Sequence, residues 1–258
     1  MDKIKKIQFI NSFSKSKFEL INKNKKLFLK KKISDPKKRD FESIQKNNFF
    51  NLNINIKNVK TELINISSFQ DLKKKKYFIS NYINGHVGDL ILTNLGFIEI
   101  NLLEKFIREY FTILQNKVKW NKFDKMIVIN KLKQVKKKIK IPYLIKLFDV
   151  NKKNILKEID RIKYYPNSFC HGDLTLSNMI IIKNKIYLID FLKTYNDGIA
   201  QDLSKLYQEF ILGWSSRKLD ERQLLRSKTI YKKIIRNNFF YSFPNNIRKV
   251  LKFEIYMK

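Results

Sequence analysis

Short apolar segments separated by polar turns occupy the first third of the chain, and this spacing is typical of β-strands. The pattern predicts five strands, at residues 7–10, 18–21, 27–33, 59–64 and 77–83. Between the third and fourth segments, the sequence Ser34-Asp35-Pro36 is typical of a helix start, because proline fits the first helical turn. We expect this helix to end near Phe50. The N-terminal part should therefore be a small sheet with one helix.

Helical periodicity dominates after Gly85. One stripe repeats at intervals of three and four residues, which predicts an amphipathic helix that packs on a core. The stripe consists of Leu103, Phe106, Ile107, Tyr110, Phe111 and Leu114. Further helices are predicted over residues 124–138, after Pro142, and around the apolar face that contains Leu203 and Leu206. The remaining residues, 212–258, are also expected to be mainly helical.

Two apolar runs, residues 179–182 and 186–189, flank the polar triplet Lys183-Asn184-Lys185. Such a pattern predicts a β-hairpin. Because a hairpin brings its two ends together, Asn178 and Asp190 should lie side by side at its open end. Asp173 precedes Asn178 by five positions. Two carboxylates and an amide oxygen would then converge, and oxygen ligands of this kind suit Mg²⁺.

The residues around this hairpin resemble a known family. His171-Gly172-Asp173, Asn178 and Ile189-Asp190-Phe191 look like the catalytic and metal-binding loops of protein-kinase-like enzymes. The His-Gly-Asp form resembles the aminoglycoside phosphotransferase and choline kinase branch. The resemblance implies a two-lobed α+β protein-kinase-like fold, with a small antiparallel-sheet N-lobe that contains one helix and a larger, mainly helical C-lobe.

The resemblance also implies roles for individual residues. Asp173 would be the catalytic base for an acceptor hydroxyl, while Asn178 and Asp190 would hold Mg²⁺ on the phosphates of ATP. The γ-phosphoryl group would pass to a hydroxyl of a small molecule. His171 is interpreted as an orienting core residue. Asp202 precedes an apolar helical face, so it could cap that helix, support the catalytic loop from behind, or do both.

The nucleotide-binding residues are expected in the N-terminal part. Leu27-Phe28-Leu29-Lys30 resembles the third-strand motif of the family, with Lys30 as the lysine that contacts the phosphates. Lys31 and Lys32 lie next to it and are alternatives. Glu42 is the acid expected to pair with Lys30. Gln45 is the alternative, because the sequence does not fix how the helix is rotated about its axis.

The strand that ends near Asn84-Gly85 should lead into the linker between the lobes. By the resemblance, the backbone of Ile83 would contact adenine and Tyr82 would pack beside it. The expected lobes are residues 1–80, which bind the nucleotide, and residues 81–258, which carry the catalytic and acceptor-binding residues.

Two departures from the family pattern bear on function. The loop over residues 11–17 contains no glycine, although glycine normally lets the backbone approach phosphates closely. An ATP-binding pseudoenzyme of the same fold is therefore an alternative. Asp202 follows Phe191 by only eleven positions, which leaves no room for a long activation segment. This short connection favours a small acceptor over a protein.

The acceptor itself is left open among an aminoglycoside, an amino alcohol and a sugar. We favour a sugar or an amino alcohol, because antibiotic-binding sites tend to be acidic and the sequence shows no acidic cluster. Asp197 and Trp214 are the residues considered for acceptor binding.

The net charge of +32 is the strongest compositional signal. It makes a basic nucleic-acid-binding protein a second alternative. However, the lysine runs are scattered over different predicted elements, so we do not expect nucleic acid as a partner, and only a weak attraction to anionic membranes stays open. The single cysteine fits a reducing compartment. With no apolar run of membrane-spanning length, we expect a cytoplasmic protein.

Overall fold

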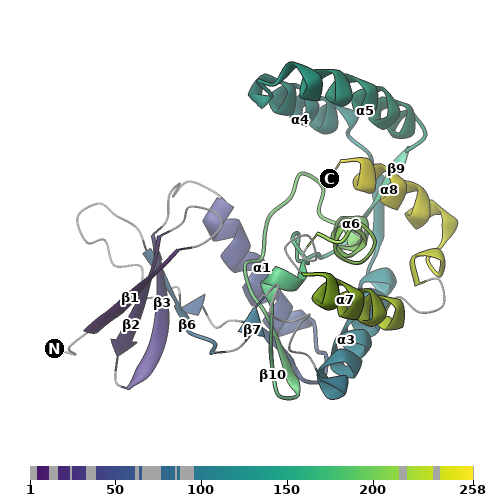
Figure 1. Cartoon of the computed structure of the whole chain (residues 1–258). Helices are drawn as coiled ribbons and strands as arrows, with labels where there is room; N and C mark the ends of the chain where they lie inside the picture. Colours follow the sequence, from purple (N-terminus) through teal and green to yellow (C-terminus); the bar gives the residue numbers. More distant parts are fainter. Residues whose placement is uncertain are drawn as a thin grey trace.

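The computed structural model describes residues 5–11, 17–23, 25–32, 39–61, 64–65, 77–84, 86–87, 96–214, 220–234 and 239–257 (Figure 1). The strands are β1 (Lys5–Asn11), β2 (Lys17–Lys23), β3 (Lys26–Lys32), β4 (Val59–Thr61), β5 (Ile64–Asn65), β6 (Tyr77–Asn81), β7 (His86–Val87), β8 (Lys119–Lys122), β9 (Tyr164–Asn167), β10 (Met179–Ile182) and β11 (Lys185–Leu188). The helices are α1 (Arg39–Asn53), α3 (Phe97–Asn116), α4 (Lys125–Lys138), α5 (Pro142–Asp160), α6 (Ile199–Phe210), α7 (Glu221–Ile234) and α8 (Asn245–Tyr256), with short 3₁₀ turns at Leu176–Asn178 and Phe239–Tyr241.

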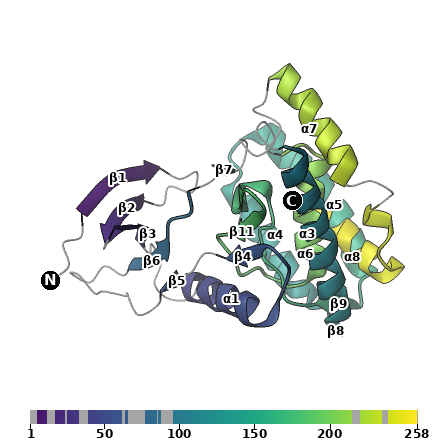
Figure 2. The ribbon, with the colours of Figure 1, turned by 90° about the horizontal axis from the view of Figure 1, so that it is seen from below.

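The N-terminal strands form an antiparallel sheet in the order β1-β2-β3-β6-β5. Its first three strands follow one another along the chain, as the alternating apolar and polar segments predict. Lys30 lies in β3, where its backbone is paired with Glu19 on β2 and Ile79 on β6. This sheet stands apart from the helical part of the molecule in both views (Figures 1 and 2).

The predicted hairpin is confirmed as β10 and β11, although β11 begins and ends one residue earlier than predicted, because Lys185 pairs in the strand and does not belong to the turn. They pair antiparallel with Met179 opposite Leu188 and Ile182 opposite Lys185. Lys183 occupies the turn with a φ of 53°, in the left-handed region that tight hairpin turns use. β7 and β4 extend the hairpin on its two sides, so the sheet order is β4-β11-β10-β7.

The prediction of one strand over residues 59–64 is wrong. β4 runs parallel to β11, with Val59 opposite Ile186, whereas β5 joins β6 in the other sheet. A run of β-forming residues predicts that a segment can form a strand, but it does not predict which strand will be its neighbour. Here the two ends of the segment pair with strands of different sheets. β6 likewise ends at Asn81, although the amide of Tyr82 still donates to the carbonyl of Leu27 at 3.1 Å.

The amphipathic stripe on α3 is confirmed, and all six of its residues are buried. They pack in one apolar core with residues of α1, the β10–β11 hairpin, α6 and α7. A second apolar cluster joins α4 and α5 to α8. α4 and α5 form a helical pair that lies away from the first core (Figure 1). The β10–β11 hairpin therefore packs on the first apolar core.

The helix limits differ from the predictions in details. α1 runs three residues past Phe50, and the expected start at residues 34–36 lies outside the described residues. Asp124 precedes α4 and caps it, since its Oδ1 accepts a hydrogen bond from the amide of Met126 at 2.9 Å.

The short strands β8 and β9 were not predicted. Among the helices in the described ranges, none is long and apolar enough to cross a membrane.

Candidate active site

The loop between β9 and β10 brings Asp173 and Asn178 together. Two backbone hydrogen bonds fold this loop back on itself, from Thr175 N to Asp173 O at 2.7 Å and from Asn178 N to Thr175 O at 3.0 Å. The side chain of Asn178 then donates from Nδ2 to Asp173 O at 2.8 Å and to Asp173 Oδ2 at 3.0 Å. Because the amide nitrogen is held in this way, the amide oxygen of Asn178 faces away from Asp173.

Asp190 lies at the end of β11, next to this loop. The amide of Ile189 donates to the carbonyl of Asn178 at 3.0 Å, which joins the two open ends of the hairpin. Asp190 has a φ of 55°, in the left-handed region. Aspartate enters this region more readily than most residues, but glycine does so with less strain. The backbone pairing therefore carries Asp190 to the level of Asn178.

His171 links the loop to the end of β11. Its Nε2 lies 2.9 Å from the carbonyl oxygen of Ile189, and its Nδ1 accepts a hydrogen bond from the amide of Asp173 at 3.3 Å. Both contacts are satisfied by a neutral ring with the proton on Nε2. Burial lowers the pKa of His171, against the opposing effect of Asp202 and Asp173, and so favours this neutral form. The interpretation of His171 as a buried orienting residue fits these contacts.

Asp202 supports the loop from behind. Its carboxylate accepts hydrogen bonds from His171 N at 2.6 Å, Gly172 N at 2.8 Å and the hydroxyl of Tyr110 at 2.6 Å. Burial, together with the charge of Asp202, raises the pKa of Tyr110 well above its usual value, so the phenol stays protonated and donates. The alternative that Asp202 caps α6 is wrong. Gly198 occupies the N-cap position of that helix, and Asp202 lies within its first turn.

Gly172 allows the loop to pass close to the following segment. Its φ is 90°, and a Cβ at this position would lie 1.9 Å from the carbonyl oxygen of Leu192. The amide of Leu192 in turn donates to the carbonyl of His171 at 2.9 Å. Any side chain at position 172 would push these two segments apart.

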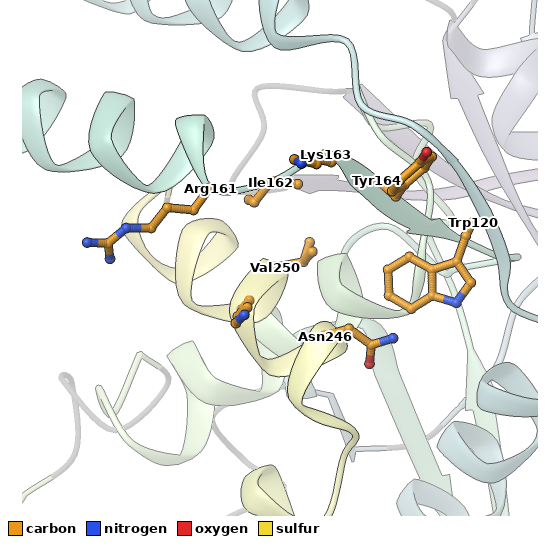
Figure 3. Close-up of a pocket in the computed structure, with 8 residues that line it drawn as sticks. Trp120, Arg161, Ile162, Lys163, Tyr164, Asn246 and Val250 are labelled. Atoms are coloured by element: carbon orange, nitrogen blue, oxygen red, sulfur yellow. The ribbon is translucent and has the colours of Figure 1, made fainter.

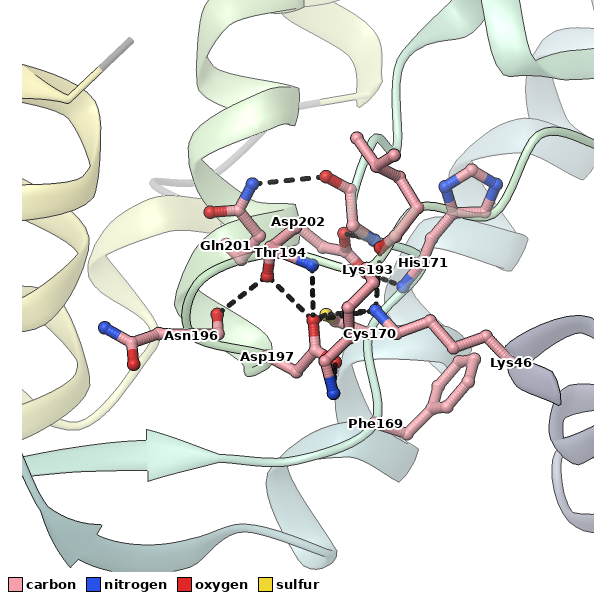
Figure 4. Close-up of polar contacts among 12 residues, drawn as sticks. Lys46, Phe169, Cys170, His171, Lys193, Thr194, Asn196, Asp197, Gln201 and Asp202 are labelled. Carbon is pink, nitrogen blue, oxygen red and sulfur yellow. Dashed lines mark hydrogen bonds and ion pairs between the residues drawn. The ribbon is translucent and has the colours of Figure 1, made fainter. Parts of the chain in front are cut away.

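A partly buried ion pair connects α1 to the segment that follows β11 (Figure 4). The Nζ of Lys46 lies 2.8 Å from Asp197 Oδ1 and 2.8 Å from the carbonyl oxygen of Leu192, and 3.4 Å from the sulfur of Cys170. Burial alone would lower the pKa of Lys46, but Cys170 and Asp197 more than offset it, so that pKa is raised. Burial alone would raise the pKa of Asp197, but the charge and the hydrogen bond of Lys46 outweigh this effect, so the pKa of Asp197 is lowered. Asp197, considered above for acceptor binding, thus holds α1 in place.

This ion pair predicts an acid-sensitive contribution to stability. Because the pKa of Asp197 is lower in the folded chain than in the unfolded chain, its contribution is complete above the unfolded value, near 4, and is lost as the pH falls through the folded value. We expect Asp197→Asn to lower the free energy of unfolding by about 1–3 kcal/mol at pH 7. Urea denaturation of both proteins at several pH values measures the difference, which should shrink below pH ~4.

The matched control for that experiment is Lys193→Ala. Lys193 also reaches Asp197, at 3.3 Å, but it is largely exposed. An exposed ion pair contributes less than about 1 kcal/mol. A difference between the wild-type protein and Asp197→Asn that stays constant from pH 7 to pH 3 would contradict the assignment.

The residues predicted for nucleotide binding are placed only in part. The side chain of Lys30 lies outside the described residues, as does the loop over residues 12–16, so the predicted pair of Lys30 with Glu42 stays a prediction. Glu42 is half-buried on α1, and the alternative Gln45 is exposed. Tyr82 and Ile83 are half-buried directly after β6.

Sequence reasoning missed two lysines near the loop. Lys205 on α6 lies 2.7 Å from Asp173 Oδ1, and Lys46 on α1 makes the contacts described above. A signal existed for the first, because Lys205 follows Asp202 by three positions and so lies one helical turn away on the same face. No sequence signal connects Lys46 to Leu192, which is 146 positions later.

A separate cavity of about 430 Å³ lies between the paired strands β8 and β9 and helix α8 (Figure 3). Trp120 and Tyr164 form its aromatic side, and Arg161 and Lys249 contribute positive charge. None of the residues predicted for the active site lines it.

Comparison with solved structures identifies the fold. The chain has the two-lobed α+β architecture of protein-kinase-like phosphotransferases, and its solved structural neighbours include aminoglycoside phosphotransferases. A thermostable mutant of the aminoglycoside phosphotransferase APH(4)-Ia superposes with a TM-score of 0.61 at 10% identity, over 98% of this chain and 85% of that chain. A ternary complex of a mutant of that enzyme with AMP-PNP and hygromycin B gives a TM-score of 0.56 at 10% identity, over 98% and 92% of the two chains.

At these identities the likeness establishes the fold alone. No protein-family model and no curated protein sequence matches the chain. The two-lobed α+β fold class that the family resemblance implies is confirmed.

Proposed function

We propose that this protein is an ATP-dependent phosphotransferase that moves the γ-phosphoryl group to a hydroxyl of a small molecule. The contact that supports this most directly is the one between Asn178 Nδ2 and Asp173 Oδ2, at the open end of a hairpin whose other end carries Asp190. A carboxylate, an amide and a second carboxylate at one hairpin end form the arrangement that phosphoryl transfer needs on a kinase-like fold.

The donor set fits a magnesium ion. Asn178 uses its amide nitrogen on Asp173, and within the described ranges no hydrogen bond involves its amide oxygen. That oxygen and the carboxylate of Asp190 would hold the ion, which takes few protein ligands and completes its shell with water and phosphate. The described residues contain no group of three or more His, Cys, Asp and Glu side chains that could hold a metal. When bound, Mg²⁺ would neutralise charge on the phosphates.

Asp173 would act as the general base. It would accept the proton of the acceptor hydroxyl while Asn178 fixes the orientation of its carboxylate. His171 and Asp202 would hold the loop from behind, since together they bind the amides of residues 171, 172 and 173. Most of the rate enhancement would come from positioning and electrostatics, because a loose phosphoryl transition state requires little covalent assistance.

The nucleotide would lie between the N-terminal sheet and this loop. Lys30 would steady the phosphates and Glu42 would orient Lys30, while the backbone of Ile83 and the ring of Tyr82 would contact adenine. These roles follow from the sequence resemblance. The boundary between lobes of residues 1–80 and 81–258 is proposed on the same basis. We propose the cytoplasm as the location of the reaction, because ATP is available there.

The acceptor would be small. The segment between Phe191 and α6 is short and is held by Lys46 and Asp197, so it offers no long platform for a polypeptide. Mutants of the structural neighbour APH(4)-Ia have been solved with hygromycin B, which shows that this fold can hold a small hydroxyl compound. For the present chain we favour a sugar or an amino alcohol, because the positive charge of the chain opposes a polycationic aminoglycoside.

The test is Mg²⁺-dependent release of ADP from ATP by the purified protein, measured with panels of sugars, amino alcohols and aminoglycosides. We expect acceptor-dependent turnover, with a phosphorylated product visible by mass spectrometry. Nucleotide binding without ADP release with any acceptor would instead favour a pseudoenzyme. Binding to nucleic acid that stays tight at physiological salt would favour a nucleic-acid-binding protein.

Asp190 offers a way to separate function from stability. We expect Asp190→Gly to lose turnover by about 10²-fold or more, because a ligand of the phosphate-bound metal is removed. The protein should stay folded, since glycine adopts a φ of 55° without the strain of a side chain. Turnover and thermal unfolding of the two proteins measure both effects.

Asp190→Asn is the matched control, because asparagine tolerates the same backbone conformation but removes the charge. It should lose turnover and leave thermal unfolding close to that of the wild-type protein. Full turnover in either variant would contradict the metal-ligand role of Asp190.

A further inference from the structure

Three residues of α6 contact three successive residues of the loop that contains Asp173. Asp202 accepts hydrogen bonds from the amides of residues 171 and 172, and Gln201 Nε2 donates to the carbonyl of Gly172 at 3.1 Å. Lys205, one turn further along the helix, reaches the carboxylate of Asp173 at 2.7 Å. The helix and the loop are therefore joined at several points, and the position of Lys205 relative to Asp173 is well defined.

Exposure distinguishes Lys205 from the other two. Asp202 is completely buried and Gln201 nearly so, which fits structural support of the loop. The side chains of Lys205 and Asp173 keep 20% and 32% of their surface exposed. Both side chains are therefore partly accessible to solutes.

The two oxygens of Asp173 have different partners. Oδ2 accepts from Asn178 Nδ2 and Oδ1 lies against Lys205 Nζ. A carboxylate has about four lone-pair positions, so an acceptor hydroxyl can still bind Asp173 while both contacts persist. An oxygen that binds Asp173 Oδ1 would lie within a few ångströms of Lys205 Nζ.

We propose that Lys205 is a further catalytic residue of the phosphotransferase, whose ammonium group contacts the phosphoryl group during its transfer at Asp173. This inference rests on the proposed function and adds a cation that α6 supplies from outside the loop. In the step itself, the O–H bond of the acceptor breaks and its proton passes to Asp173. The acceptor oxygen forms a bond to the γ-phosphorus, the bond from that phosphorus to the bridging oxygen breaks, and its electron pair leaves with ADP.

Lys205 donates hydrogen bonds in this step and gives up no proton. Negative charge spreads over the equatorial oxygens of the transferred group in the transition state, and a fixed cation there stabilises it more than it stabilises bound ATP. The effect should therefore appear in kcat and not in the KM for ATP. The other lysines described near the loop have other partners, since both Lys46 and Lys193 pair with Asp197.

The experiment uses Lys205→Cys in the full-length protein, assayed by Mg²⁺-dependent release of ADP from ATP with water as the acceptor. We expect kcat to fall by about 10²-fold or more, with the KM for ATP changed only a few-fold. Alkylation with 2-bromoethylamine then rebuilds an ammonium group at nearly the original chain length. The introduced thiol reacts selectively, because Cys170 is the only cysteine of the natural chain and is fully buried.

Recovery of kcat by at least about tenfold after aminoethylation supports a role for the positive charge. Alkylation with iodoacetamide is the matched control, because it fills the same space with a neutral amide, and it should give no recovery. Lys193→Cys, treated in the same two ways, should keep the turnover of the wild-type protein throughout. Lys205→Gln provides a second neutral variant if the thiol disturbs folding.

Failure of the proposed function and failure of the proposed role of Lys205 would give different results. If the wild-type protein releases no ADP, with water or with any acceptor, the proposed function fails and the role of Lys205 falls with it. If the wild-type protein turns over and Asp173→Asn does not, but Lys205→Cys and Lys205→Gln keep kcat within threefold of the wild-type protein, only the role of Lys205 is overturned. Equal recovery with iodoacetamide would also overturn it, because packing and not charge would then explain the loss.

Discussion

Asp173→Asn should lower kcat by about 10²–10⁴-fold while the fold stays intact, because an amide cannot accept the proton of the acceptor hydroxyl. The substitution changes no shape and leaves an oxygen that can still accept from Asn178 Nδ2, the contact that orients this side chain at 3.0 Å. Asp173 is also partly exposed, so loss of its charge leaves no buried group unpaired. Steady-state ADP release and thermal unfolding measure the two expectations separately.

Asp149→Asn is the control for this change. Asp149 pairs with Lys136 between α4 and α5, where both side chains are exposed, and it has no contact with the loop at Asp173. Its substitution should alter neither turnover nor unfolding. Turnover of Asp173→Asn equal to that of the wild-type protein would rule out Asp173 as the base. A variant that is unfolded at the assay temperature would show that Asp173 has a structural role.

Asp202→Ala should have the largest effect on stability. It removes the carboxylate shared by three buried donors, namely the amides of His171 and Gly172 and the hydroxyl of Tyr110. The amide of His171 then keeps only its longer contact, 3.1 Å, to the hydroxyl oxygen of Tyr110. Leaving buried groups unpaired in this way reduces the free energy of unfolding by about 3–5 kcal/mol, a large part of the 5–15 kcal/mol typical of a folded domain. Urea denaturation followed by circular dichroism measures the loss.

Two further variants test whether the loss of stability comes from the contacts of the Asp202 carboxylate. Tyr110→Phe removes one of the three donors and leaves the carboxylate with its two amides, so a smaller loss of about 1–2 kcal/mol is expected. Asp160→Ala removes a highly exposed carboxylate that pairs with Lys125 and should change stability by less than about 0.5 kcal/mol. If Asp202→Ala were no less stable than Asp160→Ala, the carboxylate of Asp202 would not be what holds the loop.

The features that sequence reasoning predicted well are local in the chain. The hairpin β10–β11 joins segments only a few residues apart, so its apolar pattern and polar turn are enough to define the pairing of Met179 with Leu188. The approach of Asn178 to the end of β11 then follows from the geometry of any hairpin. The apolar stripe on α3 can be predicted in the same way, because helical periodicity is a property of consecutive residues.

The features that it missed depend on partners far away in the chain. The segment over residues 59–64 has the composition of one strand, but its two ends join different sheets. Lys46 was one more lysine on a predicted helix, and its pairing with Asp197 depends on how α1 packs against a segment about 150 positions later. Asp202 was recognised as a residue of interest, but its distance from the start of α6 decided between its two predicted roles.

Local sequence is enough to form the hairpin and to set the order of Asp173, Asn178 and Asp190, because the chain must return on itself within a few residues there. The surroundings of these residues depend on tertiary packing, through which α6 holds the loop with Asp202 and presents Lys205 to Asp173, and α1 is tied to the segment after β11. The physical reason is that these contacts arise from the packing of whole helices on the core, and the energy of that packing is shared among many residues that carry no local pattern.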